Sequence, residues 1–378
     1  MSDITRPSRL YRPAADIVRS AVEEMYLRNE YSDLGGLRTG IEALDKHTRE
    51  VMMPGRVIVV AGESGRGKTA LIGQMAIAFA AQTPTMLINL EDDGVDSAKR
   101  WLANVSRENV GRIRSGFAGV DGLPKTVLDA ADHLSNLGLD VIDGEPLTVE
   151  GIARQLWEWK KERGFEQGGV VLIDQLSHVV PTDPNMRDYF VQRELPPPPA
   201  GNARADKTPE WQIWFLGEVA KRLGITVVVA HQLNNAHAID TKPTLRSVRD
   251  SQGIVHKADL ILIPWRPRML PNPFAGPGQP KEILAPEDYA MLLGVKARQV
   301  GEFEEVVSWQ GAQQRFVDLT KESYPYKAPE APSERAKEGA RRLAELRAQW
   351  EERKAAALSA PASSGALTSG KEEYNDEA

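Results

Sequence analysis

The 378-residue sequence contains no cysteine. This absence excludes a disulfide-stapled scaffold, a cysteine-ligated zinc site, an iron–sulfur cluster and a thiol nucleophile. Long apolar runs are also lacking, since no window approaches the roughly 18 residues that a membrane-spanning helix needs. The N-terminal residues lack the apolar segment of a signal peptide. We therefore expect a cytoplasmic protein without a membrane partner.

A net positive charge is the third absence. The chain carries 47 Lys and Arg residues against 53 Asp and Glu, a formal charge of −6. With no basic field over the whole molecule, a nucleic acid would have to be held by a local basic patch. The length allows two domains, or one large α/β domain with tails.

Short, nearly continuous apolar runs alternate with helical stretches along most of the chain. Such runs are typical of strands buried on both faces, as in a parallel sheet covered by helices. We therefore predict an α/β fold with a mostly parallel central sheet flanked by helices. The expected strands are Val57–Ala61, Thr85–Leu90, Leu139–Ile142, Val170–Ile173, Ile225–Ala230, Leu260–Ile263 and Met291–Val295, followed by an edge hairpin of Glu304–Trp309 and Arg315–Leu319.

We divide the chain into an N-terminal arm (1–36), a main domain (37–326) and a tail (327–378). The tail combines a charged helix with a segment of disorder-type composition. Two proline-rich segments, Pro181–Pro209 and Pro264–Pro286, are expected to be long surface loops, because proline interrupts helices and sheets.

The N-terminal arm contains a predicted helix over Pro13–Glu30. Apolar residues recur there at helical spacing and form one face of about four turns. This face either packs on the helix's own domain or is lent to a neighbouring subunit. Its residues are Ile17, Val18, Val22, Met25 and Tyr26.

Residues 62–69 match the phosphate-binding loop (P-loop) pattern G-x-x-x-x-G-K-[ST]. The pattern stands between an expected buried strand and an apolar helical stretch, which is the context it requires. Its glycines let backbone N–H groups surround phosphates at the positive end of a helix dipole. We expect Lys68 to neutralise the β- and γ-phosphates of ATP and Thr69 to place a hydroxyl on Mg²⁺. The expected nucleotide-binding residues are Gly62, Glu63, Ser64, Gly65, Arg66, Gly67, Lys68, Thr69 and Ala70.

A second acidic group for the metal follows another buried strand. Val170–Ile173 runs directly into Asp174, which we expect to hold Mg²⁺, usually through water. The next residue is Gln175 and not a glutamate, so the group that activates water for hydrolysis must lie elsewhere.

Three acidic residues at the end of the Thr85–Leu90 run compete for that role. The candidate is Glu91, with Asp92 and Asp93 as alternatives, because the carboxyl ends of parallel strands gather along one edge of a sheet. Gln232 follows the strand Ile225–Ala230, and a glutamine there can sense a γ-phosphate through a switchable hydrogen bond.

These pieces, in this order, resemble the C-terminal motor domain of DnaB-type replicative helicases, a branch of the RecA-like ATPases. The resemblance covers about residues 14–320, and its collinear order makes it specific. The matching segments are Gly36–Asp45 (G-x-x-T-G-x-x-x-L-D), Pro54-Gly55, the P-loop, Asn89–Glu91, Ile142-Asp143 with Leu147-Thr148, Leu172–Leu176, His231–Asn234, Leu245–Ser251 through Ala258-Asp259, and Lys296–Arg298.

The resemblance implies a RecA-like P-loop NTPase and assigns further roles. Glu91 matches the family's catalytic glutamate, and Gln232 its phosphate-sensing glutamine. Lys296 and Arg298 match the basic pair that each subunit inserts into its neighbour's ATP site, where an arginine stabilises charge on the transferred phosphoryl group. The helix over Pro13–Glu30 matches the linker helix that docks on the adjacent protomer.

The segment 241–268 resembles the family's DNA-contacting loop and its flanks. It holds six basic residues against two acidic ones, so such loops arranged in a ring would line a positive channel for one DNA strand. The expected DNA contacts are Arg249, Asp250 and Gly253. The resemblance implies a homo-oligomer, a hexameric ring, with single-stranded DNA and a primase or loader as partners.

Family members carry a separate helical domain before the linker, whereas 35 residues precede Gly36 here. We therefore expect a phage- or plasmid-like form that lacks this domain. The predicted function is a ring-forming, ATP-dependent DNA helicase motor. The alternatives are a RecA-like DNA-dependent ATPase that serves recombination or loading without unwinding, and a scaffold that uses ATP for assembly only.

Overall fold

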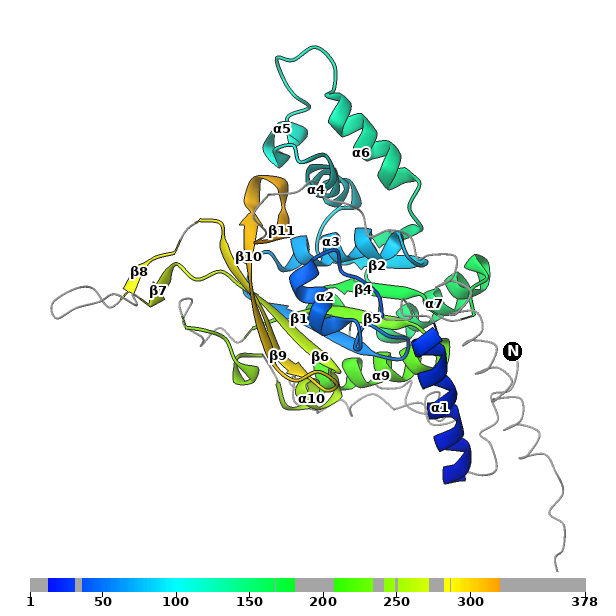
Figure 1. The fold of residues 1–378 in the computed structure, drawn as a ribbon. Helices are drawn as coiled ribbons and strands as arrows, with labels where there is room; N and C mark the ends of the chain where they lie inside the picture. The colour runs from blue at the N-terminus through cyan, green and yellow to red at the C-terminus, as the bar shows by residue number, and fades with distance from the viewer. Residues whose placement is uncertain are drawn as a thin grey trace, which may run out of the picture.

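The computed structural model places a nine-stranded mixed sheet at the centre of the described part of the chain (Figure 1). The strand order is β11-β10-β9-β6-β1-β5-β4-β2-β3, and β7 pairs with β8 in a separate two-stranded sheet. The strands are β1 (Val57–Gly62), β2 (Thr85–Asn89), β3 (Leu139–Asp143), β4 (Val170–Asp174), β5 (Thr226–Gln232), β6 (Leu260–Trp265), β7 (Met269–Pro271), β8 (Glu282–Leu284), β9 (Tyr289–Ala297), β10 (Phe303–Gln310) and β11 (Arg315–Asp318). The structure describes residues 13–30, 36–166, 168–180, 207–233, 241–248, 251–271, 282–285 and 287–319.

Helices pack on both faces of this sheet (Figure 1). The helices of the described residues are α1 (Ala14–Glu30), α2 (Glu42–Thr48), α3 (Lys68–Ala80), α4 (Gly94–Ser106), α5 (Val110–Arg114), α6 (Lys125–Ser135), α7 (Val149–Arg163), α9 (Lys207–Leu223) and α10 (Ser251–Lys257), with short 3₁₀ turns η1 (Leu176–His178), η3 (Leu245–Ser247) and η4 (Gly311–Gln313). Of these, α2, α3, α7, α9 and α10 contribute to the cores on the two faces. Capping residues determine where several of these helices begin and end. The hydroxyl of Thr148 accepts a hydrogen bond from the Gly151 N–H and begins α7, and Gly164, with φ of +67°, ends it.

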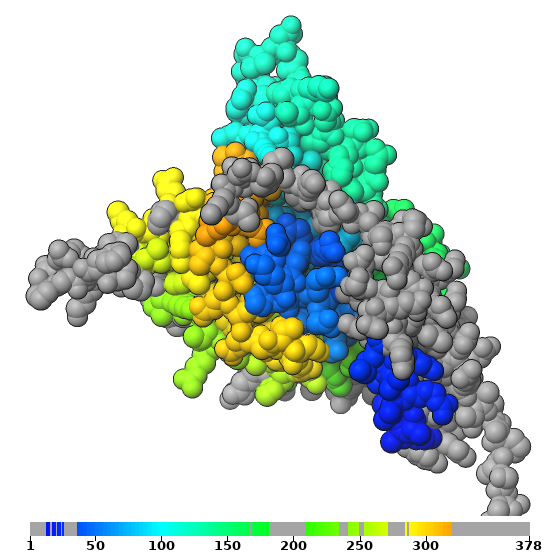
Figure 2. Space-filling view, in the orientation of Figure 1, coloured from blue at the N-terminus to red at the C-terminus, as the bar shows by residue number. Residues whose placement is uncertain are grey.

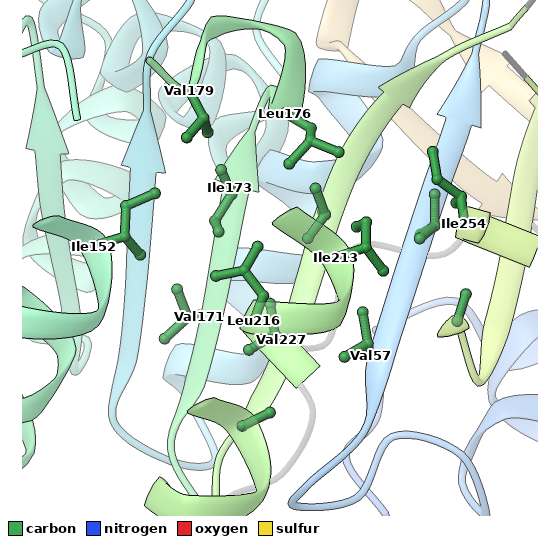
Figure 3. Close-up of a cluster of buried hydrophobic side chains, with 14 of the residues drawn as sticks. Val57, Ile152, Val171, Ile173, Leu176, Val179, Ile213, Leu216, Val227 and Ile254 are labelled. Atoms are coloured by element: carbon green, nitrogen blue, oxygen red, sulfur yellow. The ribbon is translucent and has the colours of Figure 1, made fainter. Parts of the chain in front are cut away.

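The central strand β1 supplies apolar side chains to two cores. Val57 and Val59 face a cluster built with α7, α9 and α10, which Figure 3 shows in part. Ile58 and Val60 face the opposite cluster, built with α2 and α3. Because successive strand residues point to opposite faces, an unbroken apolar run is what this central position requires.

The predicted α/β fold with a mostly parallel sheet is confirmed. The strands β3, β2, β4, β5, β1 and β6 run parallel, and β10 and β11 form the expected edge hairpin. Two expectations were wrong in detail. The run Met291–Val295 lies in β9, which is antiparallel to β6 because it belongs to a meander with β10. The run Leu139–Ile142 is not buried on both faces, because β3 is an edge strand paired only with β2 in the described part of the sheet.

Two parts stand out from the body of the molecule. The segment that holds α4, α5 and α6 projects beyond the sheet, cyan to green in Figure 2, and α1, in dark blue, lies at the periphery. No described helix or strand packs extensively against α1. Among the described residues, no helix is long and apolar enough to cross a membrane.

Several predicted features fall wholly or partly outside the described residues. These are residues 1–12, most of Pro181–Pro209, the middle of Pro264–Pro286 and the tail 327–378. Where the proline-rich segments are described, they are not loops throughout. Helix α9 begins at Lys207 with Pro209 in its first turn, where proline is tolerated, and β7 and β8 form a small antiparallel pair. The domain boundaries stay predictions.

Candidate nucleotide-binding site

The predicted P-loop joins the carboxyl end of β1 to the amino end of α3. Gly65 and Gly67 have φ of +73° and +96°, a region that favours glycine. A Cβ on Gly67 would also lie 2.8 Å from Cζ of Phe316. No described side chain caps the first turn of α3, so its N–H groups and dipole are available to an anion. Lys68 is buried beside them.

Asp174 ends β4 at the same edge of the sheet and is buried. Burial raises the pKa of its carboxyl group from 3.8 to about 6, and the negative charges of Glu91 and Asp92 add to the rise. A hydrogen bond from the Thr69 side chain and the positive charge of Lys68 partly offset this rise. The P-loop and Asp174 are thus close enough to influence each other electrostatically.

The metal-binding prediction concerns Thr69 and Asp174, which the fold brings together. Oδ1 of Asp174 is buried without a hydrogen-bond partner among the described residues. Such an oxygen beside a hydroxyl fits a hard divalent cation like Mg²⁺, which prefers oxygen ligands and takes its remaining ligands from phosphates and water. No cluster of three or more metal-ligating side chains occurs in the described ranges, so these two residues would be its protein contacts.

The structure separates the three acidic candidates that follow β2. Asp92 forms an ion pair with Arg100, and Asp93 caps α4 by accepting hydrogen bonds from the N–H groups of Val95 and Asp96. Glu91 is exposed and close enough to affect the pKa of Asp174. Of the three, Glu91 alone has no ion pair or hydrogen bond in the described structure, which leaves its carboxylate available to a water molecule.

Gln232 lies at the end of β5, directly beside the start of the P-loop. The β1–β5 register pairs Gly62 with Gln232, and the next residue, Leu233, donates its N–H to the Gly62 carbonyl at 3.4 Å. Leu233 also forms an isolated bridge with Val248, the residue before the predicted DNA contact Arg249. A short path of main chain therefore connects the predicted sensor to the predicted DNA loop.

Two residues beside the P-loop were not predicted from the sequence. The guanidinium of Arg266 lies 4.7 Å from the ring centroid of Trp309, and its Nη1 lies 3.5 Å from the Gly65 carbonyl oxygen. Burial and the nearby charge of Arg66 lower the pKa of Arg266. A cation stacked on an indole against the loop offers a flat surface and positive charge to a nucleotide. The one signal in the sequence was the basic character of segment 241–268.

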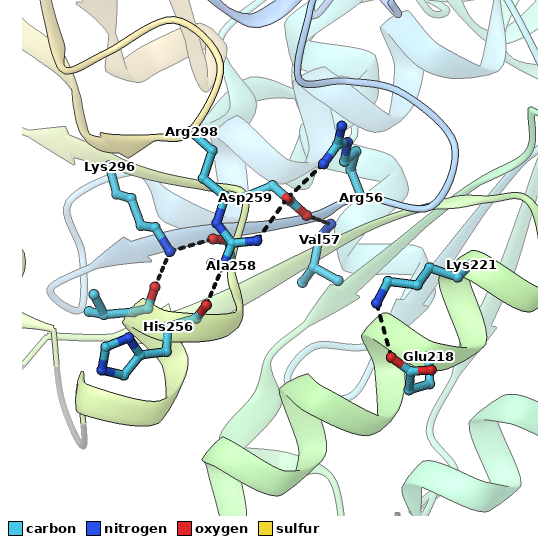
Figure 4. Close-up of polar contacts among 10 residues, drawn as sticks. Arg56, Val57, Glu218, Lys221, His256, Ala258, Asp259, Lys296 and Arg298 are labelled. Carbon is cyan, nitrogen blue, oxygen red and sulfur yellow. Dashed lines mark hydrogen bonds and ion pairs between the residues drawn. The ribbon is translucent and has the colours of Figure 1, made fainter. Parts of the chain in front are cut away.

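Lys296 and Arg298 lie at the opposite edge of the sheet from the P-loop. Lys296 pairs with Ile261 near the start of β6, whereas the P-loop follows the end of the parallel strand β1. Both side chains contact main-chain carbonyls at and beyond the carboxyl end of α10 (Figure 4): Lys296 those of Val255 and Ala258, and Arg298 that of His256. The fold therefore does not bring this pair to its own P-loop.

Of the three predicted DNA contacts, Arg249 and Asp250 lie outside the described residues. Gly253 is described, and it is buried in α10. A Cβ there would lie 1.9 Å from Cγ of Glu210 on α9. Gly253 thus lets the two helices approach each other, and its direct contact with DNA stays a prediction.

The sheet, the P-loop and Asp174 define a P-loop NTPase domain of the RecA-like class. Residues 36–195 match the family model of the DnaB-like helicase C-terminal domain. The predicted resemblance to DnaB-type helicases is therefore confirmed. The match ends before Gln232, Lys296 and Arg298.

Curated relatives support the same resemblance to DnaB-type helicases. The chain is 24% identical over 255 residues to the replicative DNA helicase DnaB of Buchnera aphidicola subsp. Schizaphis graminum, covering 65% of this chain and 50% of the relative. It is 24% identical over 262 residues to that of Helicobacter pylori, covering 68% and 49%. The chain thus spans about half the length of the curated relatives it matches.

Solved structures share the fold. The ATPase domain of G40P aligns with a TM-score of 0.65 at 17% identity, over 82% of this chain and all of that one. A DnaB-like replicative helicase, described with its interactions with primase, aligns with a TM-score of 0.64 at 18% identity, over 82% of this chain and 68% of that one.

Proposed function

We propose that the protein is a ring-forming, ATP-dependent DNA helicase motor. The observation that carries the proposal is the division of the predicted catalytic groups between two edges of one sheet. Lys68, Asp174 and Glu91 lie at one edge, and Lys296 with Arg298 lies at the other. A site completed by a neighbouring subunit accounts for this division.

In this proposal, the phosphates of ATP bind the amino end of α3 and Lys68. Thr69 and Asp174 hold Mg²⁺, which supplies charge neutralisation at the phosphate oxygens when bound. Glu91 orients and deprotonates the attacking water. Arg298 of the next subunit, with Lys296, stabilises charge on the transferred phosphoryl group, so hydrolysis depends on assembly.

Exposed apolar surface on two segments supports assembly. On α1, Val18 is 61% and Met25 is 68% exposed, and near α6, Leu123 is 51% and Leu128 is 53% exposed. Contiguous exposed apolar surface is typical of interaction sites. We infer a homo-oligomer, a hexameric ring, in which α1 docks on the adjacent protomer, and a cytoplasmic protein that works with a primase or loader.

The link from Gln232 through Leu233 and Val248 supports coupling between nucleotide and DNA. Loss of the γ-phosphate would move Gln232, and the adjacent bridge would transmit the shift through Val248 toward the predicted DNA contacts Arg249 and Asp250. Six such loops would draw single-stranded DNA through the ring.

The test is ATP hydrolysis with and without single-stranded DNA, together with unwinding of a forked duplex. We expect stimulation by DNA, complete loss in Lys68→Ala, and a decrease of about 10³-fold in Arg298→Ala. An absence of stimulation contradicts the proposal. Stimulation without unwinding would favour the RecA-like accessory, and nucleotide-dependent assembly without hydrolysis would favour the scaffold.

A further inference from the structure

Asp259, the residue before β6, is a buried carboxylate that binds two exposed guanidinium groups (Figure 4). Its Oδ1 accepts hydrogen bonds from Nη1 of Arg56 at 3.1 Å and from Nη1 of Arg298 at 3.5 Å. Its Oδ2 accepts one from the Val57 N–H at 3.0 Å. The Asp259 side chain is 8% exposed, against 45% for Arg298, so the carboxylate is the fixed member of the pair.

The main chain of Asp259 also connects the start of β1 to the end of β9. Its N–H donates to the Val57 carbonyl at 2.8 Å, and its carbonyl accepts from the Arg298 N–H at 3.1 Å. Its charge also acts on Lys296. Burial and the repulsion of Arg298 lower the pKa of Lys296 to about 8, and Asp259 opposes this decrease. Asp259 thus acts on both members of the basic pair: it binds Arg298 directly, and its charge favours the protonated form of Lys296.

We propose that Asp259 is the positioning residue for the pair Lys296 and Arg298. It fixes the direction in which Arg298 is presented to the neighbouring subunit's nucleotide and does not touch the nucleotide itself. This inference rests on the proposed function. The physical reason is that a long, half-exposed arginine samples many rotamers, and a buried anion that binds its guanidinium group restricts them before the neighbour's nucleotide is met.

The simplest variant is Asp259→Asn, which keeps the size of the side chain and an oxygen that accepts from Val57, and removes the charge. We expect the kcat of DNA-stimulated ATP hydrolysis to fall about 10- to 100-fold, because a misplaced catalytic group costs that much. The KM for ATP should stay unchanged, since the P-loop is untouched. The matched control is Arg56→Gln, which removes the other cation from the same carboxylate and should keep kcat near the wild-type value.

A structural role of Asp259 makes a different prediction. Because Asp259 also holds the start of β1, whose other end carries the P-loop, it could act on its own subunit's site. Mixing Asp259→Asn protein with Lys68→Ala protein separates the two roles. If Asp259 acts through Arg298, each Lys68→Ala subunit still presents a correctly placed Arg298 to the intact P-loop of a neighbouring Asp259→Asn subunit. The mixture then hydrolyses ATP faster than either protein alone.

Arg298→Ala mixed with Lys68→Ala is the reference. If this reference mixture recovers and the Asp259→Asn mixture does not, the positioning role is overturned while the shared site stands. If neither mixture recovers, the shared site of the proposed function is itself wrong. A fall in kcat for the double variant Asp259→Asn/Arg298→Ala below that of Arg298→Ala alone would also overturn the inference, because Asp259 would then act independently of Arg298.

Discussion

At the residue scale, Asp174 shows how a candidate catalytic site conflicts with stability. Its buried carboxyl group has a pKa raised to about 6, so the native protein ionises it at an energetic cost above that pH. The contribution of Asp174 to stability therefore falls as pH rises from about 4 to 6, since the native state holds a proton at this group that the unfolded chain has already lost.

Asp174→Asn removes this cost. A pKa change from 3.8 to about 6 corresponds to about 3 kcal/mol near neutral pH, so we expect the variant to unfold with a free energy higher by about 2 kcal/mol near pH 7.5 and to lose ATP hydrolysis. Urea unfolding checks this. The gain should shrink near pH 4.5, where wild-type Asp174 is mostly protonated. A variant less stable than wild type near pH 7.5 would contradict the burial argument.

At the scale of elements, the approach of α10 to α9 depends on one glycine. Gly253→Ala would place a Cβ 1.9 Å from Cγ and 2.4 Å from Cβ of Glu210, and the Glu210 Cβ, which is bonded to the backbone of α9, cannot swing aside as a side-chain tip would. We expect a loss of about 1–3 kcal/mol in stability and weaker binding of single-stranded DNA, because α10 follows the predicted DNA loop. Fluorescence anisotropy of labelled DNA measures the second effect.

The control is Gly217→Ala on α9, where an added Cβ would lie at an ordinary 3.4 Å from Val57 Cγ2. This variant should bind DNA as the wild type does. Nucleotide affinity should be unchanged in both proteins, since neither substitution alters the P-loop. Equal DNA binding by the two variants would show that the position of α10 does not matter to the DNA loop.

Elements of this kind also mark how far the sequence can be interpreted. Runs such as Val57–Ala61 predicted the parallel strands correctly, because a strand buried on both faces needs an unbroken apolar sequence. The same rule failed for β3, since an edge strand with one apolar face can carry a similar sequence. The orientation of β9 was also missed, because hydrophobic periodicity carries no information on strand direction.

The candidate site was predictable where residues share a motif or end neighbouring parallel strands, as Lys68, Asp174 and Gln232 do. It was not predictable where the fold alone makes the contact. Arg266 reaches the P-loop from 201 positions away, because β6 pairs with β1, and strand order is not readable from local sequence. The anchoring of Arg298 by Asp259 depends likewise on a pairing between distant strands, that of β6 with β9.

At the scale of the whole molecule, α1 offers a test of assembly. The double variant Val18→Ser/Met25→Ser changes two side chains that are 61% and 68% exposed in the single chain. Surface substitutions of this kind usually alter stability by no more than about 0.5 kcal/mol. If α1 docks on a neighbour, however, each interface loses burial worth about 1.5–3 kcal/mol per side chain. Native mass measurement with ATP and single-stranded DNA should then detect protomers in place of rings.

The expected consequence for activity follows from the proposed division of the site between subunits. A protomer released by this variant would still bind ATP through Lys68 and the amino end of α3, but no neighbour would supply Arg298, so hydrolysis should fall with assembly. Leu284→Ser, which changes an equally exposed apolar residue on β8 (78% exposed), is the control and should leave rings and hydrolysis intact. Rings that persist in the α1 variant would place the docking surface elsewhere, and full hydrolysis by isolated protomers would overturn the shared site itself.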